Sequence, residues 1–326
     1  MLGSVASRAS SPLPSPPEEG RGLASRYPDN PNGIASFSPG LRGTSYPGGI
    51  GFEVLGTLKE FNHDANHVLR RRGRKHSATL RVFELRIVKY CDLTLPTPAE
   101  NLACDEALLD LAESGAAGDL LRVWDGGQYF VVVGYGKKVS AEVDLPFCQL
   151  NTIPVLRRCT GGGTVLQGPG CLNYTLVLRI SGSENLASIT ATNKFILERH
   201  QTALATLLKA PIEMRGHTDL AIGGLKFSGN AQRRKKDFLI FHGTFMLHLD
   251  ISLIEKALPV PAKQPEYRLN RSHSDFLVNL KAPAARIKTA LAKCWDATQR
   301  LDRIPFDQIM TLARDKYSRD DWNFRF

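Results

Sequence analysis

The sequence predicts an α+β fold in which helices cover a mixed, largely antiparallel β-sheet. Helix-like and strand-like segments alternate irregularly along the chain, without the regular spacing of repeated βαβ units. Several strand-like segments are separated only by short turns rich in glycine, which is typical of antiparallel pairs. The spacings GxxxxGK[ST] and GxGxxG, which mark P-loop and dinucleotide-binding folds, are both absent. A doubly wound parallel sheet is therefore not expected.

The first predicted helix follows Thr97. Thr97 and Glu100 have the spacing of a capping box, Pro98 occupies the first helical position, and Gly115 is a typical stop residue. The next two segments, Leu120–Trp124 and Tyr129–Gly134, are rich in β-branched and aromatic residues. We predict that they form a hairpin whose turn is Asp125-Gly126-Gly127.

The second half of the chain shows the same mixture of elements. Apolar residues recur with helical spacing from Glu184 to Leu208. A strand, a Gly223-Gly224 turn and a second strand are predicted between Gly216 and Arg234, and a further strand at Phe241–Leu247. Two more helices are expected at Ala284–Ala297 and Pro305–Ala313.

The N-terminal part has a different composition from the rest. Its first 50 residues contain 8 prolines and 8 glycines, both of which interrupt regular structure. We expect residues 1–80 to be a disordered or non-functional extension and residues 81–326 to be the folded domain. The basic run at 70–76 is interpreted as a solvated linker.

Composition limits the classes of function. The net charge of +10 favours anionic ligands or acidic partners, but aromatic residues do not alternate with basic ones as on a base-stacking surface, so no nucleic acid is expected. No apolar run is long enough to span a membrane. The six cysteines lack the spacing of a zinc site or a disulfide scaffold. We therefore expect a cytoplasmic protein with free thiols and no metal-ligating cluster.

The most informative segment is the glycine-rich loop from Arg157 to Gly163. Three consecutive glycines cost backbone entropy and supply no side chain for packing, but they let backbone N–H groups approach an anion closely. Arg157 and Arg158 add positive charge beside them. Read alone, the same residues also fit an ordinary hairpin turn with surface arginines.

A second group of residues indicates which reaction could take place beside this anion site. Lys226 follows the Gly223-Gly224 turn, Asp219 precedes it, and His242-Gly243-Thr244 lies further along. A lysine beside a glycine-rich anion site can bridge a carboxylate and a phosphate while one attacks the other. That is the chemistry of carboxylate adenylation, in which pyrophosphate leaves and the acyl group then passes to an amine.

These motifs together resemble the catalytic domain of the lipoate–protein ligase A family, within the wider biotin/lipoate ligase group. The matching residues are Arg157-Arg158-Cys159-Thr160-Gly161-Gly162-Gly163-Thr164-Val165, then Asp219-Leu220 and Lys226-Phe227-Ser228-Gly229-Asn230-Ala231, and then His242-Gly243-Thr244. The likeness extends from Asn101 to Phe324. The resemblance implies a fold like that of the class II synthetase-like ligase domain, so that residues 81–326 would be its catalytic domain.

The resemblance also implies the roles of individual residues. Lys226 would be the catalytic residue and would contact the acyl carboxylate and the α-phosphate. The nucleotide, ATP with Mg²⁺, would be held by Arg158, Gly161, Gly162, Gly163, Thr164, Val165, Leu166, Asp219 and Lys226. The acyl substrate, lipoate or octanoate, would be held by Arg157, Asn173, Ser228, Gly229 and His242. Val131–Val133 and Leu172–Leu176 are candidate apolar walls.

Two departures from the family pattern limit the assignment. Gln167 stands where many ligases have histidine. The related octanoyltransferases use a nucleophilic cysteine, in some of them about ten residues before the Asp-Leu pair, but Lys209–Arg215 contains none. Cys159 and Cys171 are interpreted as packing residues. The sequence therefore favours an adenylate route over a thioester route.

The implied function is attachment of lipoate to a specific lysine of an acceptor domain. Acceptors would be lipoyl domains of 2-oxoacid dehydrogenases or the glycine-cleavage H protein, whose acidic surfaces suit a basic enzyme. Bacterial ligases carry a small accessory domain after the Trp-Asn-Phe segment, and this sequence ends there, so a separate accessory subunit is one expectation. Transfer from preformed lipoyl-adenylate or from acyl-carrier protein, a non-catalytic nucleotide-binding protein, and biotin transfer remain alternatives.

Overall fold

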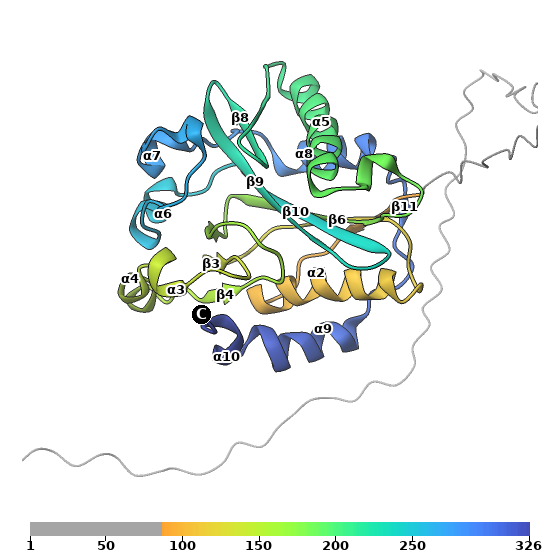
Figure 1. Cartoon of the computed structure of the whole chain (residues 1–326), viewed down its shortest axis with the longest axis horizontal. Coiled ribbons are helices and arrows are strands. Elements are labelled where there is room, and N and C mark those ends of the chain that lie inside the picture. The colour runs from red at the N-terminus through yellow and green to blue at the C-terminus, as the bar shows by residue number, and fades with distance from the viewer. Residues whose placement is uncertain (1–86) are drawn as a thin grey trace, which may run out of the picture. The chain divides into compact units, whose positions relative to one another are not determined.

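A mixed eight-stranded sheet is the centre of residues 87–326, the part of the chain that the computed structural model describes (Figure 1). The predicted N-terminal extension and the basic run at 70–76 lie outside these residues. The strand order is β11-β1-β2-β6-β10-β9-β8-β7, and a second sheet has the order β4-β3-β5. The strands are β1 (Lys89–Asp92), β2 (Leu120–Trp124), β3 (Phe130–Val133), β4 (Val155–Arg157), β5 (Val165–Gln167), β6 (Cys171–Arg179), β7 (Glu213–Arg215), β8 (Asp219–Ile222), β9 (Leu225–Arg234), β10 (Phe238–Met246) and β11 (Gln299–Arg300).

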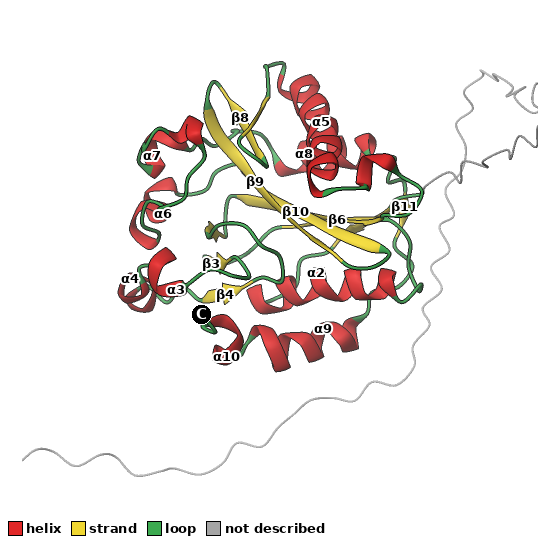
Figure 2. Cartoon of the chain, in the orientation of Figure 1, coloured by secondary structure: helices red, strands yellow, loops and turns green. Residues whose placement is uncertain are grey.

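Helices cover both faces of the large sheet (Figure 2). Helices α5 and α8 lie on one side, and α2 and α9 lie on the other. The helices are α2 (Pro98–Glu113), α3 (Val139–Glu142), α4 (Leu145–Leu150), α5 (Ile189–Leu208), α6 (Ile251–Ala257), α7 (His273–Phe276), α8 (Ala284–Cys294), α9 (Phe306–Leu312) and α10 (Asp320–Asn323), with short turns η2 (Glu184–Leu186), η3 (Glu266–Arg268) and η4 (Ala313–Tyr317). The predicted α+β class is confirmed: three strand pairs are parallel, and the others are antiparallel.

The central strands are buried on both faces because their side chains alternate between two hydrophobic layers. On β10, Phe238 and Ile240 pack in the layer beneath α2, whereas Leu239 and Phe241 pack in the layer beneath α5. This alternation follows from the two-residue repeat of a strand. It explains why the stretches Leu176–Leu178 of β6 and Phe238–Phe241 of β10 are continuously apolar, unlike strands with one face in water.

Several local predictions are confirmed. Thr97 caps α2 through its side chain, Glu100 completes the capping box, and Gly115 follows the helix with φ of +82°. The Gly223-Gly224 turn joins β8 to β9, and both glycines have positive φ. The helix predicted from Glu184 begins as the short turn η2, and α5 itself starts after Ser188, whose side chain caps it.

The predicted hairpin of Leu120–Trp124 with Tyr129–Gly134 is wrong. Strand β2 pairs with β1 and β6 in the large sheet, whereas β3 pairs with β4 and β5 in the small one. The connecting residue Asp125 does not close a tight turn, because its N–H donates to Thr94 Oγ1 (3.1 Å) and its carboxylate accepts from the same hydroxyl (2.9 Å). The glycines after Asp125 therefore carry the chain from one sheet to the other.

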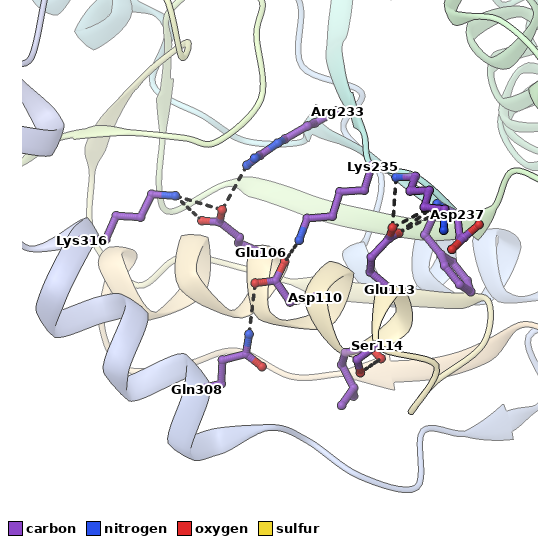
Figure 3. Close-up of polar contacts among 12 residues, drawn as sticks. Glu106, Asp110, Glu113, Ser114, Arg233, Lys235, Asp237, Gln308 and Lys316 are labelled. Carbon is purple, nitrogen blue, oxygen red and sulfur yellow. Dashed lines mark hydrogen bonds and ion pairs between the residues drawn. The ribbon is translucent and has the colours of Figure 1, made fainter.

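Acidic side chains on α2 hold the β9–β10 hairpin and the C-terminal helices in place (Figure 3). Glu106 accepts from Arg233 on β9 (3.1 Å) and from Lys316 in η4 (2.6 Å). Glu113 caps the hairpin turn, since its carboxylate accepts from the N–H groups of Lys236, Asp237 and Phe238 at 2.9–3.2 Å. Burial opposes ionisation of Glu113, but these donors prevail and lower its pKa.

Arg157 at the end of β4 fastens the C-terminal segment to the small sheet. Its side chain is fully buried, and its guanidinium donates to five backbone carbonyls at 2.8–3.1 Å, those of Gly134, Tyr135, Lys137, Trp322 and Asn323. The Arg157 N–H donates to Asn323 Oδ1 (2.9 Å), and Trp322 Nε1 donates to the Arg157 carbonyl (2.9 Å). Two chain segments 165 residues apart are thereby locked together.

Replacing Glu113 by alanine is expected to lower the free energy of unfolding by about 1 kcal/mol at pH 7, because three turn N–H groups lose a charged acceptor. A carboxylate with a lowered folded-state pKa stabilises the fold above its unfolded pKa of about 4.3, and this contribution is lost as pH falls through the lower folded pKa. Urea unfolding at pH 7 and pH 3 measures the difference. The matched control is Glu198→Ala on α5, whose pair with Lys194 is exposed and should change stability by less than about 0.5 kcal/mol. An equal effect of both substitutions would contradict the capping role.

Arg157→Lys is expected to lower the free energy of unfolding by about 2 kcal/mol or more, since an ammonium has only three donors for five buried carbonyls. The measurement is the urea midpoint at unchanged slope. Arg319→Lys is the control, because Arg319 is exposed and pairs only with Asp321. Wild-type stability of the Arg157 variant would show that the carbonyl contacts are dispensable.

Candidate functional site

One cavity of about 660 Å³ collects most of the residues that the sequence singled out. It lies between the glycine-rich loop, the β8–β9 hairpin, β10, and the segment from α6 to α7. The predicted site residues that line it are Arg158, Gly161, Gly162, Gly163, Thr164, Val165, Leu166, Asn173, Asp219, Lys226, Ser228, Gly229 and His242. Arg157 does not line it, because its guanidinium points away and donates to the carbonyls of Trp322 and Asn323.

The glycine-rich loop is shaped by Arg158. The guanidinium donates to the carbonyls of Gly161 (2.6 Å) and Gly163 (2.7 Å), and burial lowers its pKa to about 10. Gly162 adopts φ of +90°, and a Cβ there would lie 2.8 Å from Arg158 Nη2. The backbone N–H groups of Gly161, Gly162 and Gly163 donate to no acceptor in residues 87–326. Such a row of free N–H groups suits an anion.

Lys226 is held at the cavity by a carboxylate. Its Nζ lies 2.8 Å from Asp219 Oδ1, across the β8–β9 hairpin. The other oxygen of Asp219 accepts from the Tyr267 hydroxyl (2.8 Å), which comes from the segment between α6 and α7. A Cβ at Gly229 would lie 3.0 Å from Lys226 Nζ, so the glycine leaves room for the ammonium. Lys226 remains 24% exposed in its side chain and is accessible to a ligand.

His242 lies within a chain of polar contacts that connects Arg122 to Thr160. Arg122 donates to Asp105 Oδ1 (2.6 Å), Asp105 Oδ2 lies 3.2 Å from His242 Nδ1, and His242 Nε2 lies 2.7 Å from Thr160 Oγ1. Burial would raise the pKa of Asp105, but Arg122 and His242 outweigh it and lower that pKa. Asp105 and His242 both line the cavity, and the sequence assigned no role to Asp105.

Further along β6 and β10 the cavity wall contains amides and hydroxyls. Thr244 Oγ1 donates to Asn173 Oδ1 (2.6 Å) and accepts from Gln167 Nε2 (2.7 Å). Gln167, which replaces the histidine of many ligases, thus takes part in this network. Seven buried polar atoms of lining residues have no partner within the described chain: Trp124 Nε1, Thr164 Oγ1, Gln167 Oε1, Asn173 Nδ2, Ser228 Oγ, Gln232 Oε1 and Arg268 Nη2. Buried polar groups are normally paired, so unpaired ones in one cavity point to a polar ligand.

The cavity also has an apolar lining suited to an alkyl chain. Of the predicted walls, only Val132, Asn173 and Tyr174 line it. On β3 the side chains alternate, so Val131 and Val133 pack in a separate hydrophobic cluster. Most of the apolar lining comes from residues that the sequence did not indicate, since they converge from separate elements: Leu102, Trp124, Met246, Ile254, Leu258, Phe276 and Leu277.

None of the chain's six cysteines, all of which the structure describes, lines this cavity. Cys159 and Cys171 are buried beside the loop, and burial raises their pKa values to about 11 and about 12. A thiol with a raised pKa is a poor nucleophile at neutral pH. Their placement agrees with packing roles.

Two further structural findings concern the sequence-based exclusions. None of the helices in residues 87–326 combines the length and the apolar character that a membrane span requires. Within the same residues, no three His, Cys, Asp or Glu side chains gather as metal ligands.

Comparison with known proteins relates this cavity to a family. The model of the lipoyl protein ligase A/B catalytic domain matches residues 97–292. The octanoyltransferase LipM of Geobacillus kaustophilus is 25% identical over 272 residues, 73% of this chain and 98% of that protein. Subunit 1 of lipoate-protein ligase A from Thermoplasma acidophilum is 27% identical over 252 residues, 71% of this chain and 95% of that protein.

Solved structures share the fold at low sequence identity. The bi-partite lipoate protein ligase of T. acidophilum, described with its E2 lipoyl domain, has a TM-score of 0.61 and 23% identity over 73% of this chain and 96% of that one. A T. acidophilum structure with bound lipoic acid (74% and 99% covered) and a lipoate-protein ligase A bound with ATP (73% and 98%) have the same TM-score and identity. The match of the family model over residues 97–292, more than half of the sequence, shows that this chain belongs to the lipoyl protein ligase A/B catalytic domain family.

Proposed function

We propose that this protein attaches a lipoyl or octanoyl group to a lysine of an acceptor domain through an acyl-adenylate. The observation that carries the proposal is the placement of Lys226, held by Asp219, in the same cavity as the free N–H groups of the glycine-rich loop. A mobile cation and a fixed row of donors are what an anionic substrate pair requires while charge redistributes. The apolar lining of the cavity suits the alkyl chain.

The proposed reaction has two steps. A carboxylate oxygen of the acyl substrate attacks the α-phosphorus of ATP, the bond to the β-phosphate oxygen breaks, and pyrophosphate leaves. Lys226 would exchange Asp219 for the acyl carboxylate and the α-phosphate, where it offsets their mutual repulsion. The acceptor amine then attacks the acyl carbonyl, AMP leaves, and the amine proton is released. Asp219 keeps the Tyr267 hydroxyl as a partner throughout.

The proposed ligands are ATP, Mg²⁺ and lipoate. Support for ATP and lipoate comes from the related structures, one bound with ATP and one with lipoic acid. Arg158 and residues 161–166 would hold the nucleotide, while Asn173, Ser228, Gly229 and His242 would hold the acyl substrate. Asp219 is the carboxylate nearest to Lys226 and is suited to Mg²⁺ that arrives with the phosphates, a hard cation that keeps most of its water ligands.

The proposed partner is an acidic lipoyl acceptor domain, of a 2-oxoacid dehydrogenase or of the glycine-cleavage H protein. The T. acidophilum ligase was described with an E2 lipoyl domain, and it is bi-partite. We therefore include a separate accessory subunit in the proposal. The net charge of +10 would speed encounter with an acidic acceptor, and that advantage would fall with salt.

A second candidate is acyl transfer from acyl-carrier protein without ATP. It is favoured by the likeness to LipM, which extends over 98% of that octanoyltransferase. It is opposed by the cavity, in which no cysteine of this chain is available as a nucleophile. A transferase of this kind would need another residue to carry the acyl group.

The test uses three tubes, each with the purified chain and an apo acceptor domain, read by the intact mass of the acceptor. The first contains Mg-ATP and lipoate, the second synthetic lipoyl-adenylate, and the third octanoyl acyl-carrier protein without nucleotide. We expect a modified acceptor in the first two. Product from the adenylate alone would place activation on a second chain. Product in the third tube alone would overturn the adenylate proposal.

Replacing Lys226 by alanine is expected to lower transfer by about 100-fold or more, because the cation that moves onto the reacting carboxylate is lost. The fold should remain, since Lys226 is partly exposed and Asp219 keeps Tyr267. Initial rates in the first two tubes, with circular dichroism as the folding control, measure this. Lys194→Ala, an exposed lysine on α5, is the matched control. Near-normal transfer by the Lys226 variant would remove the site assignment.

A further inference from the structure

A further cation that lines the cavity, Arg268, has no role among the residues assigned above. Arg268 is 4% exposed and lines the cavity from the segment between α6 and α7. Its Nη2 has no hydrogen-bond partner in the described chain. An arginine is rarely buried without a partner for each nitrogen, since leaving a charged donor unsatisfied costs stability. A buried, unpaired guanidinium nitrogen on a side chain that lines a cavity indicates a missing anion.

The groups around Arg268 do not neutralise it. Its Nε donates to the Arg271 carbonyl (3.0 Å), and its guanidinium lies 4.8 Å from the centre of the Phe276 ring. Within residues 87–326 it forms no ion pair. Glu255 attracts it at longer range, but the Glu255 carboxylate accepts from the N–H and the hydroxyl of Ser274 at 3.0 Å. Burial lowers the pKa of Arg268.

The neighbouring Arg271 has hydrogen-bond acceptors of its own. The Arg271 guanidinium donates to the carbonyls of Tyr267 (2.8 Å), Gly224 (3.3 Å) and Asp275 (3.3 Å), and Nε to that of Arg268 (3.0 Å). His273 also lines the cavity, and burial lowers its pKa. Lys263 also lines the cavity, but its side chain is exposed to solvent. Arg268 is therefore the buried cation of this segment that has a nitrogen to offer.

This segment is joined directly to the hairpin that carries Lys226. Tyr267, the residue before Arg268, contacts Asp219, which holds Lys226. Val278 N–H donates to the Lys226 carbonyl (2.9 Å), after α7, and α6 and α7 lie together beside β8 and β9 (Figure 1). Arg268 and Lys226 thus line one cavity from two connected segments.

We infer that Arg268 binds the pyrophosphate portion of the nucleotide, the β- and γ-phosphates of ATP and the pyrophosphate that leaves. The inference rests on the proposed adenylate function and extends it. Lys226 is a single compact charge for the carboxylate and the α-phosphate, whereas a planar guanidinium suits the several oxygens of a polyphosphate. A guanidinium at the β- and γ-phosphates would stabilise the charge of the leaving pyrophosphate, which Lys226 at the α-phosphate does not reach in this proposal. An enzyme that used only preformed adenylate would have no need for this arginine.

The experiment titrates the full chain by calorimetry with sodium pyrophosphate, with ATP and with lipoate in separate arms. Arg268→Met keeps the side-chain length and removes the charge, and Arg319→Met, at an exposed surface pair, is the matched control. We expect Arg268→Met to weaken pyrophosphate and ATP binding by about tenfold or more and to leave lipoate binding within twofold. The melting temperature without ligand should not fall, because the variant no longer buries an unpaired charge.

Other outcomes would overturn either the assignment of Arg268 or the proposed function. Unchanged pyrophosphate affinity in Arg268→Met would remove the site, and loss of lipoate affinity alone would assign Arg268 to the acyl carboxylate. If Arg268→Met does not fold, Arg268→Lys decides, since it keeps the charge but loses the planar fork and should still weaken pyrophosphate binding. A wild-type chain that binds pyrophosphate but modifies no acceptor from ATP would refute the proposed function and leave this site standing. Transfer from ATP with unchanged affinity in the Arg268 variants would do the reverse.

Discussion

The buried ion pair between Arg122 and Asp105 is the contact on which the site depends most. Arg122 on β2 is fully buried, and all of its nitrogens donate: to Asp105, to the Asn101 amide and to backbone carbonyls. It therefore fixes α2 against the sheet, and Asp105 in turn fixes His242 on β10. Because loss of either partner would leave an uncompensated buried charge, at a cost of about 3–5 kcal/mol, the arrangement of helix and cavity wall has little freedom to drift.

Four buried arginines show how partner type separates structure from function. Arg122 has a carboxylate, and Arg157 and Arg158 are saturated by carbonyl oxygens, whereas Arg268 has an unpaired nitrogen. Carbonyls satisfy the hydrogen bonds of a guanidinium without cancelling its charge. Arg158 and Arg268 therefore each bring a positive charge without a carboxylate partner to the cavity wall, which favours ligands with several negative charges.

Local signals in the sequence were sufficient for the fold class, the capped start of α2 and the β8–β9 turn, because each depends on neighbouring residues. They could not show that Arg158 faces the cavity and Arg157 does not. Consecutive residues at the end of a strand face opposite sides, and the side that faces the cavity is decided by Trp322 and Asn323, 165 residues away. Asp125 failed as a turn residue for the same reason, since its partner is Thr94 on another strand's end. Arg268 had no local signature at all.

The contacts of Asp219 connect the two cationic ends of the cavity. One oxygen of Asp219 holds Lys226 and the other holds Tyr267, the residue that precedes Arg268. In the reaction proposed above, an anion that drew Lys226 away would leave Tyr267 as the partner of Asp219 within the chain, and this contact would hold the segment that carries Arg268 at the cavity. A polyphosphate on Arg268 would hold the same segment from its other side. Each ligand thus lowers the ordering cost of the other, and by linkage the carboxylate and the polyphosphate would favour each other's binding by the same factor.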